Sequence, residues 1–126
     1  MNAIFAKLTV MCLVILVMGC SYLAVPQYDA TEYQTLIQIA AHSDQGTCTV
    51  EQTTHLVTLS TFLKYYTEYL PHNDLMWEGA IELDASIRGL HTAPQPYTAT
   101  YCTLRLRLIH TMATTLAQAS GSKVRS

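Results

Sequence analysis

The segment Asp74–Leu90, DLMWEGAIELDASIRGL, decides the fold class. Its apolar side chains recur at intervals of four, three, four and three residues, at Met76, Ala80, Leu83, Ile87 and Leu90. This spacing places all five on one face of an α-helix, which is typical of a helix that packs into a bundle. Asn73 or Asp74 is expected to cap the helix at its start, and Gly89 with the following TAPQP is expected to end it.

Three other segments carry the same helical spacing. The first is expected to begin at Asp29, with Glu32 as its capping-box partner, and to end near Ser43. The second is expected to run from its cap at Thr49 to Pro71, where the missing N–H stops a helix. The third is expected over 97–119, although TLRLRLI within it alternates as a strand would, because the helical seam extends beyond it on both sides. The predicted apolar stripes are Tyr33, Leu36, Ile37, Ala40 and Ala41 in the first, Leu56, Leu59, Leu63, Tyr66 and Leu70 in the second, and Cys102, Leu106, Ile109, Ala113 and Leu116 in the third.

Four helices joined by short loops predict an all-α fold, a small antiparallel four-helix bundle over residues 29–119. The last residues, 120–126, read as a flexible tail. The net charge is −2 and no basic cluster exists, which excludes the class of nucleic-acid-binding proteins because phosphate recognition needs a positive surface.

The chain begins with a different pattern. Leu8–Met18 is an uncharged apolar run of eleven residues behind the single charge of Lys7. A transmembrane helix needs about 20 apolar residues, so the run fits the apolar region of a secretory signal instead. It ends in Val17-Met18-Gly19-Cys20.

This ending resembles the lipobox of bacterial lipoproteins, with an aliphatic residue at minus three, a small residue at minus one and then cysteine. The resemblance implies that residues 1–19 are a signal peptide removed by signal peptidase II. It implies that Cys20 carries a diacylglyceryl group on sulfur and an acyl group on its new amine. These acyl chains would anchor the protein to a lipid bilayer. Residues 20–28 would then be a lipidated tether, and no other cofactor is expected.

Ser21 follows the anchor residue. In Gram-negative lipoproteins Ser at this place permits export, so the resemblance implies a location in the cell envelope at the outer membrane, on its periplasmic side. A Gram-positive surface lipoprotein is the alternative.

The four cysteines are accounted for by this interpretation. Cys12 would leave with the signal and Cys20 would carry lipid, so Cys48 and Cys102 remain as a pair in an oxidising compartment. In an antiparallel bundle the second and fourth helices run the same way, and both cysteines lie near the start of such a helix. We therefore predict a Cys48–Cys102 disulfide bond, which by loop entropy contributes about 4 kcal/mol. Two free buried thiols are the alternative.

The five histidines give a weak signal for a site. His42, His72 and His91 fall at predicted helix C-termini, where the helix dipole favours positive charge. His55 and His110 fall at similar heights on two parallel helices. However, His110 is rotated by about 80° from the direction of Cys102. We predict no metal site, and a metal or small ligand held by His55 and His110 is kept as an alternative.

No motif predicts catalysis. Glu78, Glu82 and Asp84 are interpreted as a solvated face, with Asp84 paired to Arg88 one turn on. Neither the Glu-x-x-His of di-iron bundles nor the G-x-S-x-G of serine hydrolases occurs. No catalytic residue is assigned, and the protein is predicted not to be an enzyme.

Aromatic residues give the strongest functional lead. Tyr65 and Tyr69 share one side of their helix, and Trp77 lies in the first turns of the next. Tyrosine and tryptophan are enriched in binding hot spots and near lipid headgroups. We therefore expect these three residues to bind an envelope protein partner, in a non-enzymatic interaction or accessory protein. The alternatives are a phage- or plasmid-type exclusion or lysis lipoprotein, and a ligand- or metal-binding helical module.

Overall fold

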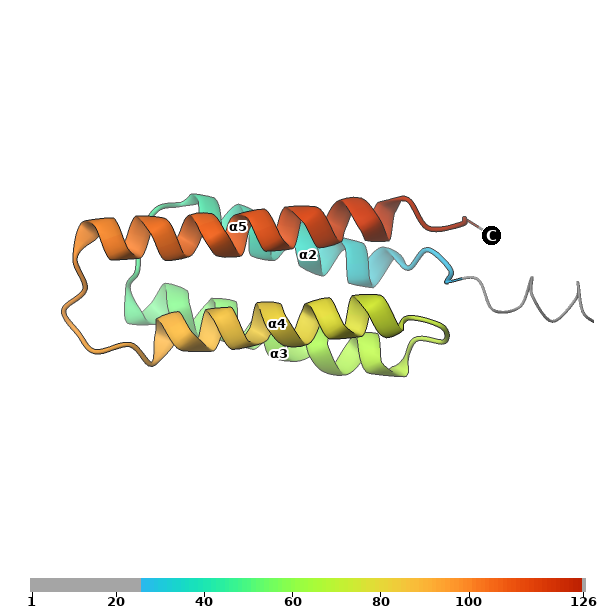
Figure 1. Cartoon of the computed structure of the whole chain (residues 1–126), viewed down its shortest axis with the longest axis horizontal. Coiled ribbons are helices and arrows are strands. Elements are labelled where there is room, and N and C mark those ends of the chain that lie inside the picture. Colours follow the sequence, from blue (N-terminus) through green and yellow to red (C-terminus); the bar gives the residue numbers. More distant parts are fainter. Residues whose placement is uncertain (1–25, 126) are drawn as a thin grey trace, which may run out of the picture.

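The computed structural model describes residues 26–125, which form a bundle of four helices (Figure 1). These are α2 (Ala30–Asp44), α3 (Val50–Tyr69), α4 (Asp74–His91) and α5 (Ala99–Gly121). Successive helices run in opposite directions, so the predicted antiparallel four-helix bundle is confirmed. The predicted signal peptide, residues 1–19, and the tether as far as residue 25 lie outside the described residues.

Each helix contacts two neighbours. α2 packs against α3 and α5, and α4 packs against α3 and α5, so α3 and α5 lie diagonally opposite each other, as do α2 and α4. Figure 1 shows α5 beside α2 and α4 beside α3. Different loops and chain segments form the two ends of the bundle. We call one the termini end, formed by residues 26–28, the α3–α4 loop (70–73) and residues 122–125. The other is the disulfide end, formed by the α2–α3 loop (45–49) and the α4–α5 loop (92–98).

Helix starts are set by capping side chains. Asp29 Oδ1 accepts the N–H of Glu32 at 2.9 Å, and Thr49 Oγ1 accepts the N–H of Gln52 at 3.2 Å, as the capping pattern predicts. The cap of α5 is Thr98, whose Oγ1 accepts the N–H of Tyr101 at 3.1 Å. Asn73 is the N-cap of α4, but its side chain makes no capping hydrogen bond because it points into the bundle instead.

The seam of α4 is confirmed in full, since all five of its apolar side chains are buried. In α5 the predicted seam is buried from Cys102 to Ala113. It then continues through Ala117 and Ser120, while Leu116 is only half-buried. These two helices supply much of the apolar core, whose burial stabilises by about 25 cal/mol per Å² of apolar surface.

The predicted stripes of α2 and α3 are partly wrong. In α2 Leu36 and Ala40 are buried as expected, but Ile37 is 40% exposed. The buried face of α2 consists of Glu32, Thr35, Leu36, Ile39, Ala40 and Ser43. In α3 the half-buried Leu59, Tyr66 and Leu70 lie beside a buried seam of Thr53, Leu56, Ser60, Leu63 and Thr67. The predicted stripes are partly wrong because polar residues occupy several core positions, and a search for apolar residues alone does not find these positions.

These buried hydroxyls satisfy their own hydrogen-bonding capacity. In α3, Thr53 and Thr67 each donate to the carbonyl three residues earlier, at 3.1–3.2 Å, and Ser60 donates to Asp84 Oδ1 at 2.7 Å. In α2, Ser43 donates to the carbonyl of Ile39 at 2.6 Å. Such bonds let a small polar side chain lie in the core without an unpaired group.

The C-terminal residues differ from the predicted flexible tail. α5 extends to Gly121, Ser120 is fully buried, and Gln27 forms a β-bridge with Val124. The N–H of Tyr28 donates to the carbonyl of Val124 at 2.9 Å. Residues 26–28 of the predicted tether are therefore paired with residues 122–125, and Ser126 lies outside the described residues. Among the helices of the described part, none has the length and apolar character required to cross a membrane.

Candidate functional site

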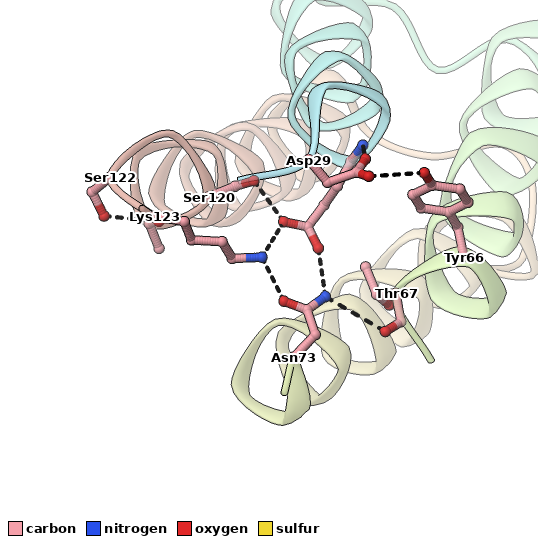
Figure 2. A network of polar contacts seen from close by, with 9 residues as sticks. Asp29, Tyr66, Thr67, Asn73, Ser120, Ser122 and Lys123 are labelled. Carbon is pink, nitrogen blue, oxygen red and sulfur yellow. Dashed lines mark hydrogen bonds and ion pairs between the residues drawn. The ribbon is translucent and has the colours of Figure 1, made fainter. Parts of the chain in front are cut away.

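A buried polar network joins all four helices at the termini end (Figure 2). At its centre is Glu32, from the first turn of α2, which is 0% exposed. Its Oε2 accepts the side-chain N–H of Asn73 at 2.6 Å, and its Oε1 accepts Lys123 Nζ at 2.6 Å and the hydroxyl of Ser120. Lys123 also donates to Asn73 Oδ1, and its side chain is only 6% exposed. The buried carboxylate thus accepts three hydrogen bonds, one of them from a cation, which offsets the cost of its burial.

The network continues toward α3. Asp29 Oδ2 accepts the hydroxyl of Tyr66 at 3.0 Å, and the amide of Asn73 also approaches the carbonyl of Thr67 at 3.5 Å (Figure 2). The start of α2, the end of α3, the start of α4 and the end of α5 are therefore held by one set of hydrogen bonds. Both carboxylate oxygens of Glu32 and the ammonium group of Lys123 have hydrogen-bond partners, so the pair joins these segments directly.

A half-open hollow of about 540 Å³ lies at the same end of the bundle. Asn73 and Lys123 of the network are among its lining residues. The other lining residues come from the two termini, the α3–α4 loop and the adjoining turns of α4 and α5, and they are Pro26, His72, Asp74, Leu75, Met76, Ala119, Ser122 and Val124. The wall is mostly apolar, and Pro26, where the described chain begins, is part of it.

The opposite end carries the predicted disulfide bond. Cys48 and Cys102 are joined, with Sγ–Sγ 2.06 Å and Cα–Cα 6.0 Å. The bond links the residue before the cap of α3 to the first turn of α5, so two parallel helices are connected where both begin. This confirms both the pairing and the topology from which it was predicted.

Among the described residues, no hydrogen bond or ring contact joins His55 to His110, the pair on which the ligand-binding alternative rests. His55 Nε2 lies 3.1 Å from Nε2 of His42, whereas His110 Nδ1 lies 2.9 Å from the carbonyl oxygen of Ala40. His55 and His110 therefore have separate partners. His91, at the end of α4, lies 2.9 Å from the hydroxyl of Thr53. Within residues 26–125, no set of three or more His, Cys, Asp or Glu side chains is placed to hold a metal ion.

The aromatic residues predicted to bind a partner lie near the termini end. Tyr65 is 54% and Tyr69 is 84% exposed, and Trp77 is half-buried. Among the described residues no ring contact joins these three side chains. Tyr65 instead lies beneath the ammonium group of Lys64, 4.9 Å from its ring centre. Their role in binding a partner stays a prediction.

The predicted solvated acidic face is wrong for one of its members. Glu78 and Glu82 are exposed, but Asp84 is buried. Asp84 accepts Arg88 Nε at 2.9 Å, as the spacing predicts, and also Ser60 Oγ at 2.7 Å and Lys64 Nζ at 3.3 Å. Burial raises the pKa of Asp84, but hydrogen bonds from Arg88, Ser60 and Lys64 and the charge of Arg88 outweigh it and hold the pKa below its ordinary value.

Sequence reasoning assigned Glu32 only to a cap and missed its place in the core. The available signal was its spacing, because positions 32, 36, 39 and 43 repeat at intervals of four, three and four residues. Ser120 likewise continues the seam of α5 at the same intervals. Lys123 lies beyond the helix, and no periodicity could identify it.

The remaining predicted site, the lipidation residue Cys20, lies outside the described residues. Comparisons of this chain with known protein families, with curated proteins and with solved structures found no match.

Proposed function

We propose that this protein is a lipid-anchored lipoprotein of the bacterial cell envelope, which acts as a non-enzymatic interaction or accessory protein. The observation that carries the proposal is the Val17-Met18-Gly19-Cys20 sequence behind an apolar run of eleven residues. The proposed lipids are a diacylglyceryl group and an acyl group on Cys20. The proposed location is the outer membrane, on its periplasmic side.

Two structural features support this proposal. The Cys48–Cys102 disulfide bond agrees with an oxidising compartment such as the periplasm. In addition, the described chain begins at Pro26, six residues after the proposed anchor, at one end of a long bundle. A tether of this length holds the bundle within about 20 Å of its membrane.

The proposed binding surface lies on the membrane-proximal half of the bundle. Tyr65 and Tyr69 occupy the last two turns of α3, and Trp77 lies in the first turn of α4. A partner that contacts these side chains must itself be at the membrane surface or embedded in it. Exposed aromatic side chains of this kind supply much of the binding energy in protein interfaces.

The test is affinity capture after crosslinking in membranes, with the native chain and a Tyr65→Ala/Tyr69→Ala/Trp77→Ala variant. The matched control is Tyr101→Ala/Leu104→Ala/Leu108→Ala, which removes an exposed apolar stripe from α5, with exposures of 38%, 57% and 44%. We expect one envelope protein to be recovered with the native chain and the control. We expect its recovery to fall at least tenfold with the first variant, which corresponds to about 1.4 kcal/mol. Equal recovery with all three chains would contradict the proposed surface.

A further inference from the structure

The termini end of the bundle carries the most exposed large apolar side chains of residues 26–125. Tyr69, the last residue of α3, is 84% exposed, and Leu75, in the first turn of α4, is 83% exposed. Val124, which lines the hollow together with Leu75, is 47% exposed. Burial of one such side chain is favourable by about 1.5–3 kcal/mol, so an apolar environment at this end would stabilise all three.

The path of the chain brings this end to a membrane. The β-bridge between Gln27 and Val124 fixes the start of the described chain beside Val124, and both Pro26 and Val124 line the hollow. If Cys20 carries lipid, six residues separate the anchor from Pro26, and they span at most about 20 Å. α5, with 23 residues, is about 35 Å long, so the disulfide end lies much farther from the anchor than the termini end does.

The charges at this end are of both signs. Glu68 and Asp74 are opposed by Arg125, whose guanidinium lies 4.8 Å from the ring centre of Tyr28, and Lys123 is already paired with Glu32. This balance does not select an anionic headgroup. Tyrosine and exposed leucine, in contrast, suit the boundary between headgroups and acyl chains.

We propose that the termini end is a membrane-contacting surface, on which Tyr69, Leu75 and Val124 enter the headgroup region of the bilayer that holds Cys20. The bundle then stands on this end, with the disulfide bond directed away from the lipid. This inference rests on the proposed function, since the anchor supplies the high local concentration that three side chains alone do not. Tyr69 lies at the border with the proposed partner surface, and Tyr65 is about 6 Å farther from the membrane along α3.

The inference is tested on the full-length protein, purified from membranes and placed in vesicles of phosphatidylethanolamine and phosphatidylglycerol. A nitroxide is attached at Leu75→Cys, at Tyr69→Cys and, as a matched control at the disulfide end, at Val50→Cys, a side chain that is 64% exposed. Because these positions are exposed, the label does not disturb the core. Cys48 and Cys102 are already joined, so the introduced thiol takes the label.

We expect relaxation of the nitroxide by a water-soluble nickel chelate to fall several-fold at positions 69 and 75 and to stay high at position 50. High relaxation at all three positions would overturn the inference, as would a fall at position 50 alone. The mass of the N-terminal peptide is measured on the same samples. If Cys20 is acylated and position 75 stays open to the chelate, the membrane contact fails while the anchor stands. If Cys20 carries no lipid, both proposals fail.

Discussion

Asp84 shows how a charge is held inside a small bundle. Its carboxylate is 5% exposed and is surrounded by donors from two helices, Ser60 and Lys64 on α3 and Arg88 on its own helix. Lys64 and Arg88 keep 25% and 47% of their side chains exposed, so the two cations stay partly hydrated while the anion is buried. The cost of burying one charge is thus offset by hydrogen bonds to the charged form.

The lowered pKa of Asp84 predicts a pH dependence of stability. The unfolded chain binds the proton of this group more tightly than the folded chain does. The contribution of Asp84 is therefore present above its ordinary pKa of about 3.8 and is lost as the pH falls through the lower, folded-state value. We expect Asp84→Asn to lower the free energy of unfolding by about 1–3 kcal/mol at pH 7 and by less at pH 3.

Urea unfolding followed by circular dichroism at pH 7 and pH 3 measures this difference. Glu78→Gln, on the exposed face of the same helix, is the control and should change stability little at either pH. An equal loss of stability for Asp84→Asn at both pH values would show that the charge of Asp84 is not what stabilises the fold.

At the scale of elements, the Glu32–Lys123 pair ties α2 to the segment that follows α5. Each single substitution leaves a buried charge unpaired, so Glu32→Gln and Lys123→Met should each cost about 3–5 kcal/mol of folding free energy. The double variant removes both charges and should cost clearly less than the sum of the two single variants. Urea unfolding of the native protein and the three variants gives the coupling energy. Additive losses would mean that the two side chains act independently.

The same elements show what the sequence could predict. Apolar spacing identified all four helices, and the order of helices with the two cysteines identified the topology and the disulfide bond. Apolar spacing did not predict the polar residues in the core, which include Glu32 and Thr35 in α2 and Ser60 in α3. Burial of these groups depends on partners from other helices, such as Asn73 for Glu32 and Asp84 for Ser60. Such partners are distant in sequence, and no local pattern reveals them.

The candidate site was predictable only in part for the same reason. Tyr65 and Tyr69 were expected at the surface from their helical phase, and the structure places them there. The buried network and the hollow beside it arise from four chain segments, 26–32, 66–76, 119–120 and 122–124, which meet only after the bundle has formed.

At the scale of the whole molecule, different interactions hold the two ends of the bundle together. The disulfide bond constrains one end, where α3 and α5 begin. The Glu32 network constrains the other, where the first and last described residues lie side by side and where the proposed tether joins the bundle. Under the proposed function, a short lipid tether would hold the second end near the bilayer and leave the disulfide end farther from it.

The measurement that tests the central claim most directly is the mass of the N-terminal peptide of the mature protein, isolated from the membranes of cells that produce it. We predict a chain that starts at Cys20, with a diacylglyceryl group on the sulfur and an acyl group on the amine. We also predict that Cys20→Ser abolishes this processing. A mature chain that starts at another residue, or that retains a free thiol at Cys20, would contradict the account.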